Sequence, residues 1–243
     1  MSKKQLKYQL DFSRRAHVRR MESGLHEQVE RLEAWQKQRL LVTYADLSAE
    51  PRYRRATAFF VDELYAPADL SQRDQDLERM YPFMVRMLPD KVLQVVASAL
   101  ELQGLTLELD LNVARVLHEK DIDPGPMTME EYGMAYRALD NRAVREHQLE
   151  LIMTVGTGLQ RYVHNPMIYA SLKMARPLAV MTGLEQLQQF LENGFTSFRD
   201  MEEADDFLGT IASREHAVLD ALMNDELARI EHWFRDPQPR PAA

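Results

Sequence analysis

Residues 59–65 read Phe-Phe-Val-Asp-Glu-Leu-Tyr, and the helical pattern of this stretch is the starting point for predicting the segments around it. A helix is predicted to carry it from Pro51, because a proline at the first helical position loses no hydrogen bond. Pro67 marks the end of that helix, since the residue before a proline avoids helical backbone. One apolar stripe recurs at every fourth residue along it: Ala56, Phe60 and Leu64.

The two acidic residues of the stretch face differently. Asp62 points away from the apolar stripe, whereas Glu63 falls near its edge. A carboxylate in that position must be paired or hydrogen-bonded, or its pKa must shift. The next predicted helix supplies candidate partners, because Arg73 and Asp74 flank its own apolar stripe. Pro82 lies inside this second helix and predicts a kink or a break.

The stretch 59–65 resembles the signature of the bacterial FFLEELY motif proteins, with five of the seven positions identical. Val61 stands for Leu and Asp62 for Glu, and both replacements are conservative. Positions further along are similar to the same family: Pro67, Asp69, Arg73, Asp74 and Pro82. The resemblance implies a helical fold group and no mechanism.

The composition predicts an all-α protein. The 243 residues include nine glycines, and good helix formers dominate. We expect a single bundle-like domain of roughly seven to nine helices over residues 21–235. A Pro-rich tail, residues 236–243, is expected to be disordered.

The charge is uneven along the chain. Residues 1–20 hold seven basic residues and one acid, whereas the whole chain has a net charge of −8. Three interpretations of this basic N-terminal arm stay open: a frayed, solvated terminus that folds back at times, a segment that docks on the acidic body, or a segment that binds an anionic partner such as nucleic acid or a lipid surface. The basic side chains concerned are Lys3, Lys4, Lys7, Arg14, Arg15, Arg19 and Arg20.

The chain has no cysteine, which excludes disulfides, thiolate metal sites and a cysteine nucleophile. No signal peptide is recognisable, and no apolar run approaches the roughly 18 residues that span a bilayer. A cytoplasmic location is therefore expected.

Periodicity and breakers predict the remaining helices. Capping boxes are expected at Thr128 and Thr182, a helix stop at Gly104 and another at Asn193-Gly194. The alternating leucines after Gly104 leave 105–120 ambiguous, and we choose helix because a lone strand has nothing to pair with. The predicted elements are helices at 22–47, after Pro89 to Gly104, 105–120, 128–140, 141–164, 166–177 and 201–233, with a surface loop at 121–126.

Polar residues on apolar helix faces are the candidate site. Arg145 and Gln148 share a stripe with Leu149 and Ile152, and Glu215 shares one with Ile211. Two interpretations stay open: a buried network that fixes how the helices meet, or a polar pocket in which an arginine holds a small anionic ligand. The complete set of candidate ligand-binding residues is Glu63, Arg73, Asp74, Arg145, Gln148 and Glu215.

No recognisable catalytic motif is present: the sequence has no Glu-x-x-His pair, no His-Glu-x-x-His zinc motif and no P-loop. We therefore expect no metal and cannot name a cofactor. The favoured function is a non-enzymatic interaction or adaptor protein with a protein partner. The alternatives are a small-molecule-binding protein or enzyme with a polar pocket, and a binder of anionic surfaces through the N-terminal arm.

Overall fold

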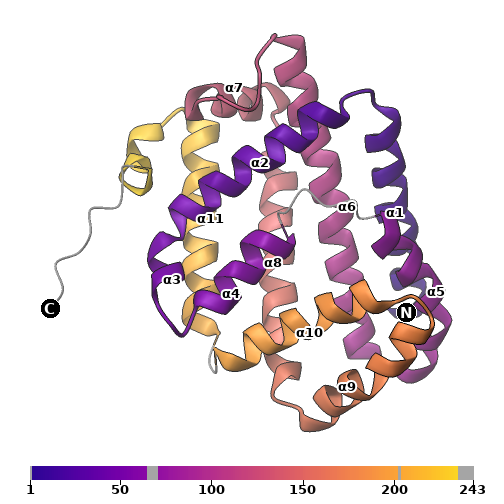
Figure 1. The fold of residues 1–243 in the computed structure, drawn as a ribbon. Coiled ribbons are helices and arrows are strands. Elements are labelled where there is room, and N and C mark those ends of the chain that lie inside the picture. The colour runs from indigo at the N-terminus through magenta and orange to yellow at the C-terminus, as the bar shows by residue number, and fades with distance from the viewer. Residues whose placement is uncertain (1, 65–70, 202–203, 235–243) are drawn as a thin grey trace, which may run out of the picture.

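The computed structural model describes residues 2–64, 71–201 and 204–234, with the backbone alone at 63, 64, 71–75, 83, 87 and 178. These residues form α-helices and no strand, which confirms the all-α class (Figure 1). Their eleven α-helices exceed the seven to nine expected. The helices are α1 (Ser2–Glu22), α2 (His26–Thr43), α3 (Ala45–Ala49), α4 (Arg54–Phe59), α5 (Ser71–Met87), α6 (Asp90–Glu119), α7 (Met129–Leu139), α8 (Arg142–Val163), α9 (Pro166–Met181), α10 (Glu185–Asp200) and α11 (Asp205–Asn224).

The long helices α6, α8 and α11 form the centre of the molecule, with α1 packed along α6 and α2 crossing over them (Figure 1). Helices α9 and α10 pack together at the far end from α7. Three apolar clusters hold this arrangement. The first joins α2, α6, α7 and α11, the second joins α2, α4, α10 and α11, and the third joins α1, α5 and α6.

The separate basic arm is not confirmed, because its residues form helix α1. Leu6 and Leu10 are fully buried in the cluster with α5 and α6. Three of the basic side chains of α1 form ion pairs with acids of other helices: Arg14 with Glu78, Arg19 with Glu108 and Arg20 with Glu33. Lys7 pairs with Asp11 within α1. The sequence analysis considered only the charge of this segment and overlooked the apolar stripe of Leu6 and Leu10, through which α1 packs on the protein.

Several predicted helix ends are wrong because tertiary contacts override local breakers. Helix α6 runs through Gly104, α9 runs through Pro177, and α10 runs through Asn193-Gly194. Helix α5 continues through Pro82, so of the kink or break predicted there the break does not occur. Added Cβ atoms on Gly104 and Gly194 would lie 2.7 Å from the rings of Phe12 and Phe59, so these glycines serve close helix packing rather than termination.

Other predicted helices are shorter than expected. Gly24 has a φ of 74° and ends α1, so the helix predicted over 22–47 begins at His26. Pro51 lies in a turn before α4, and the backbone of 60–64 is a π-helix. The last helix ends at Asn224 because Asp225 is left-handed, and two 3₁₀ turns follow at Leu227–Arg229 and Glu231–Trp233.

Of the two predicted capping boxes, one is present and the other is not. Thr128 makes the predicted one, with Glu131 bonding back to its N–H. Thr182 does not, because its hydroxyl donates to the carbonyl of Ala179 and α10 begins after Leu184. The loop at 121–126, the helix over 105–120 and the helix over 141–164 are confirmed.

Gly156 and Gly158 of α8 permit close helix crossings. A Cβ on Gly156 would lie 2.5 Å from the Leu208 side chain of α11, and one on Gly158 would lie 2.6 Å from the Val95 side chain of α6. Helix α8 is therefore held tightly between its two neighbours, and both glycines lie within it without interrupting it.

Helix α6 is, within the described part of the chain, the one helix long and apolar enough to cross a membrane. Its most apolar window has a mean hydropathy of 1.3. A single such helix is weak evidence, since core helices of soluble proteins pass the same test. Here Leu93, Leu100, Leu107 and Leu117 of α6 are buried in the core.

We predict opposite effects of alanine at two helical glycines. Gly104→Ala should lower the free energy of unfolding, because the Cβ meets the Phe12 ring and lies 3.1 Å from the backbone of Ser13. Overpacking costs about 1–3 kcal/mol, against about 1 kcal/mol gained in helix propensity. Gly209→Ala meets nothing within 4 Å and should gain about 1 kcal/mol. Urea unfolding measures both, and equal stabilisation by the two would contradict the close α1–α6 packing.

Candidate functional site

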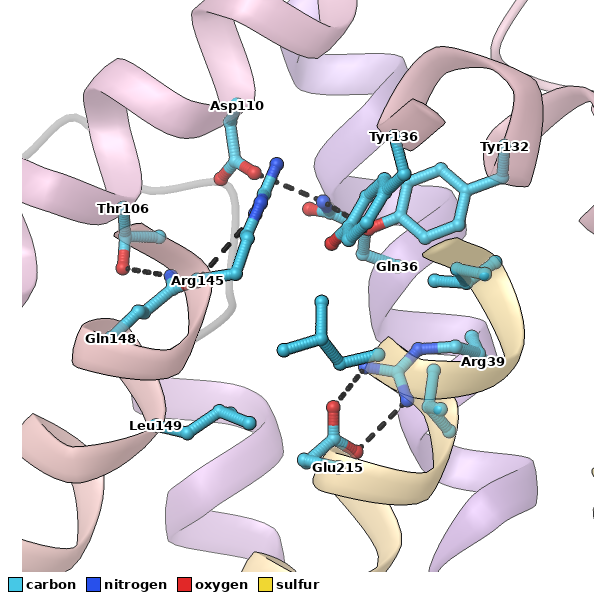
Figure 2. Close-up of a pocket in the computed structure, with 13 residues that line it drawn as sticks. Gln36, Arg39, Thr106, Asp110, Tyr132, Tyr136, Arg145, Gln148, Leu149 and Glu215 are labelled. Atoms are coloured by element: carbon cyan, nitrogen blue, oxygen red, sulfur yellow. Dashed lines mark hydrogen bonds and ion pairs between the residues drawn. The ribbon is translucent and has the colours of Figure 1, made fainter. Parts of the chain in front are cut away.

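A small polar cavity lies where α2, α6, α7, α8 and α11 meet (Figure 2). Its volume is about 40 Å³. One water needs about 10–15 Å³, so it has room for about three waters or a small ion of similar size. The residues that line it are Gln36, Arg39, Thr106, Asp110, Tyr132, Tyr136, Arg145, Gln148, Leu149, Glu215, Val218, Leu219 and Leu222.

One wall of the cavity is a closed ion pair. Arg39 donates to both carboxylate oxygens of Glu215 at 2.9 and 2.8 Å, and the hydroxyl of Tyr44 donates to Glu215 at 2.8 Å. Both charged side chains are less than a tenth exposed. Because the pair is bidentate, its charges cancel locally and the Arg39–Glu215 wall adds no net charge to the cavity.

A hydrogen-bonded chain forms the opposite wall. The amide nitrogen of Gln36 donates to Asp110 at 2.9 Å and to the Tyr132 hydroxyl at 3.1 Å. The hydroxyls of Tyr132 and Tyr136 lie 2.8 Å apart. These side chains come from α2, α6 and α7, so the chain ties three helices together around the cavity.

Arg145 has the most unmet hydrogen-bonding groups in the cavity. It is 4% exposed, and its Nε and Nη2 atoms have no hydrogen-bond partner among the described residues, whereas Arg39 and Gln36 each have one such atom, Nε and Oε1. Its one side-chain hydrogen bond, to Gln148, is long at 3.5 Å, and its guanidinium lies 4.2 Å from the centre of the Tyr136 ring. Figure 2 shows the guanidinium between Asp110 and Tyr136. Burying an unpaired guanidinium costs free energy, and a bound anion would offset that cost.

The neighbouring carboxyl group, that of Asp110, does not pair with Arg145. Burial raises the pKa of Asp110, although Gln36 and Arg145 oppose the rise. No ion pair joins Asp110 to Arg145 among the described contacts. Burial also raises the pKa of Glu33 to about 7 despite its pairing with Arg20. Among the described contacts, Arg145 therefore has no carboxylate paired with it.

Helical periodicity explains how the sequence builds the cavity. On α8, Arg145, Gln148 and Leu149 follow at spacings of three and four, so they share one face. On α2, Gln36 and Arg39 share the buried face with Leu32. Gln148 also donates to Thr106 of α6 at 2.8 Å, which fixes how α8 sits against α6.

The structure brings together three of the six predicted site residues: Arg145, Gln148 and Glu215 all line the cavity. Glu215 pairs with Arg39, a partner that the sequence did not suggest. The other three, Glu63, Arg73 and Asp74, have side chains outside the described residues.

The sequence analysis missed Gln36, Arg39, Asp110, Tyr132 and Tyr136. Gln36 and Arg39 carried the same signal as Arg145, a polar residue on an apolar stripe. Asp110 carried it too, between Leu107 and Val113, but the strand-like leucines of that segment obscured its helical facing.

A family model described as a domain of unknown function (DUF8198) matches residues 15–229. No curated protein and no solved structure matches the chain. The matched range contains every residue that lines the cavity.

We predict that the Arg39–Glu215 pair is essential for stability. Glu215→Ala leaves the Arg39 guanidinium buried and unpaired, which should cost about 3–5 kcal/mol of unfolding free energy. Asp46→Ala removes the partner of Arg214 in a more exposed pair and should cost about 1 kcal/mol or less. Chemical denaturation measures both variants.

The double variant Arg39→Met with Glu215→Leu is the complementary control. It removes both charges together and should recover most of the stability lost in Glu215→Ala. A double variant as unstable as the single one would show that packing, rather than the unpaired charge, causes the loss.

Proposed function

The chain belongs to this DUF8198 family, whose description carries no activity, and from the cavity we propose that it is a helical protein that binds a small anion at Arg145. The observation that carries the proposal is the buried Arg145 guanidinium, whose Nε and Nη2 atoms have no partner among the described residues, at the edge of the cavity. A planar oxyanion accepts two parallel hydrogen bonds from a guanidinium, which is the strongest pairing open to it.

The cavity size supports a narrow class of ligands. About 40 Å³ suits an anion of three or four heavy atoms, such as formate, nitrate or bicarbonate. Tyr136 and Gln148 lie beside Arg145 and offer further polar contacts. The apolar side chains of Leu149 and Leu219 also line the cavity, so part of a ligand here would lie against apolar surface.

The resemblance of residues 59–65 to the FFLEELY motif proteins stays a prediction beside this proposal. So do a cytoplasmic location and a role without catalysis. The polar-pocket alternative now has specific support, because Arg145, Gln148 and Glu215 line one cavity.

Protein interaction is the second candidate function, and one surface favours it. Met167, Met174 and Met181 of α9 are 78%, 80% and 85% exposed, and their spacing of seven puts them on one side of the helix. Methionine surfaces adapt to apolar partners. Lys173 and Arg176 are the charged residues of α9, and Arg176 is paired with Glu192 of α10. The remaining cation, Lys173, favours an amphipathic partner helix with acids beside its apolar face.

We predict that formate stabilises the wild-type protein in a saturable way, since a ligand that binds only the folded state raises its stability. Arg145→Met keeps the side-chain bulk and removes the donors, so it should abolish the shift in melting temperature. Arg115→Met, an exposed arginine of α6, is the matched control and should keep it. The measurement is a thermal shift series with formate, nitrate and the larger phosphate at constant ionic strength.

Size selectivity decides the outcome of this series. Formate and nitrate should act, whereas phosphate should act weakly because it exceeds the cavity. Equal shifts in the Arg145→Met and Arg115→Met variants would overturn the anion site, since the effect would then arise from general salt screening.

The α9 candidate predicts binding of an amphipathic helical peptide with leucines on one face and glutamates beside them. Fluorescence anisotropy should show binding that Met167→Gln with Met174→Gln weakens by about tenfold or more, the cost of losing two buried apolar contacts. Met21→Gln, on exposed Met21 of α1, is the control. Equal binding of a lysine-flanked peptide would contradict the acidic-partner claim.

A further inference from the structure

A second site lies in an open groove between α6 and α8, away from the cavity at Arg145. Its volume is about 520 Å³, within the range of about 300–1,000 Å³ typical of small-molecule sites. The groove shares no lining residue with the cavity. Its lining residues are Lys91, Gln94, Val95, Ser98, Met153, Thr154, Thr157, Gly158, Arg161 and Tyr162.

Two matching helical stripes form the groove. The stripe on α6 occupies positions 91, 94, 95 and 98, and the stripe on α8 occupies positions 154, 157, 158 and 161. Within each stripe the residues are three, four or seven positions apart, so they share one face of the helix. The helices run antiparallel, since Gln148 bonds Thr106 while Gly158 lies against Val95. Lys91 and Arg161 therefore lie on the same side of the Val95–Gly158 contact, at one end of the groove.

The charge of the groove is positive in a protein that is acidic as a whole. Lys91 and Arg161 line it and no acidic residue does, although the chain has a net charge of −8. Neither cation forms an ion pair with any described acid, and both are exposed. Two uncompensated cations at one end of a concave site favour an anionic group there.

The rest of the lining suits an organic body attached to that anion. Val95, Met153 and the ring of Tyr162 provide apolar surface, and the close approach of Val95 to Gly158 forms the floor. Ser98, Thr157 and Gln94 add hydrogen-bonding groups along the walls. A ligand with a charged head and a compact apolar or aromatic part matches both features.

We propose that this groove binds an organic phosphate monoester, with the phosphate held by Lys91 and Arg161 and the organic part lying over Val95 and Met153. A phosphate group carries up to two charges and three strong acceptor oxygens at neutral pH. It therefore matches two cations with neighbouring hydroxyl donors better than a carboxylate, which has one charge and two oxygens.

The probe is phenyl phosphate, compared with benzoate and with inorganic phosphate, in isothermal titration calorimetry on the full chain. Phenyl phosphate should bind most tightly, because it alone supplies both the dianion and the ring. Lys91→Gln and Arg161→Gln should each weaken it roughly tenfold, the usual effect of losing one charge-assisted hydrogen bond. Lys120→Gln, on an exposed lysine at the other end of α6, is the matched control and should leave binding unchanged.

A steric variant tests the same groove without changing its charge. Thr157→Trp places a large ring in the open volume from an exposed position, so it should block phenyl phosphate while the melting temperature stays near that of the wild type. Absence of binding to the wild type at millimolar concentration would overturn the proposal. Loss of binding in Arg145→Met with Lys91→Gln unaffected would also overturn it, because binding would then depend on Arg145 and not on the groove.

Discussion

The fold depends on where buried charge is neutralised. The Glu215 carboxylate receives two hydrogen bonds from Arg39 and one from Tyr44 in a site that water hardly reaches. This arrangement joins α2 to α11 and satisfies both charges, so burying them costs little net free energy. Helix α2 can therefore cross the central helices with Gln36 and Arg39 buried beside its apolar residues.

Arg145 lies in the same cavity and lacks what Arg39 has. Its guanidinium has a tyrosine ring and a distant amide as neighbours, and the nearby Asp110 has a raised pKa. The two arginines of this cavity differ in charge pairing. Arg39 bonds both oxygens of the Glu215 carboxylate, whereas Arg145 has no paired carboxylate among the described residues, and this difference marks Arg145 as the candidate binding residue.

The sequence predicted the facing of residues better than their partners. The stripe on α11 correctly included Glu215, and that on α8 included Arg145 and Gln148, because a 3.6-residue period fixes which side chains share a face. It could not identify Arg39 as the partner of Glu215, since the two lie 176 residues apart and meet only through the packing of α2 on α11.

Helix ends were harder to predict for a related reason. Gly104 and Gly194 read locally as stops, yet each lies in a helix against an aromatic ring from a distant segment. Similarly, the basic charge of α1 outweighed the spacing of Leu6 and Leu10, which already indicated a buried face. In each case the structure depends on a residue that is distant in the sequence, and the local pattern alone does not identify that residue.

The central claim is that an anion occupies the cavity at Arg145, and the side-chain Nε–H resonance of that arginine reports on it most directly. We would follow this resonance by ¹⁵N NMR during a formate titration, with Arg145→Lys to assign it. The account predicts a saturable shift of this one resonance and a slower exchange of its proton with water. A resonance that stays fixed while those of exposed arginines move would contradict it.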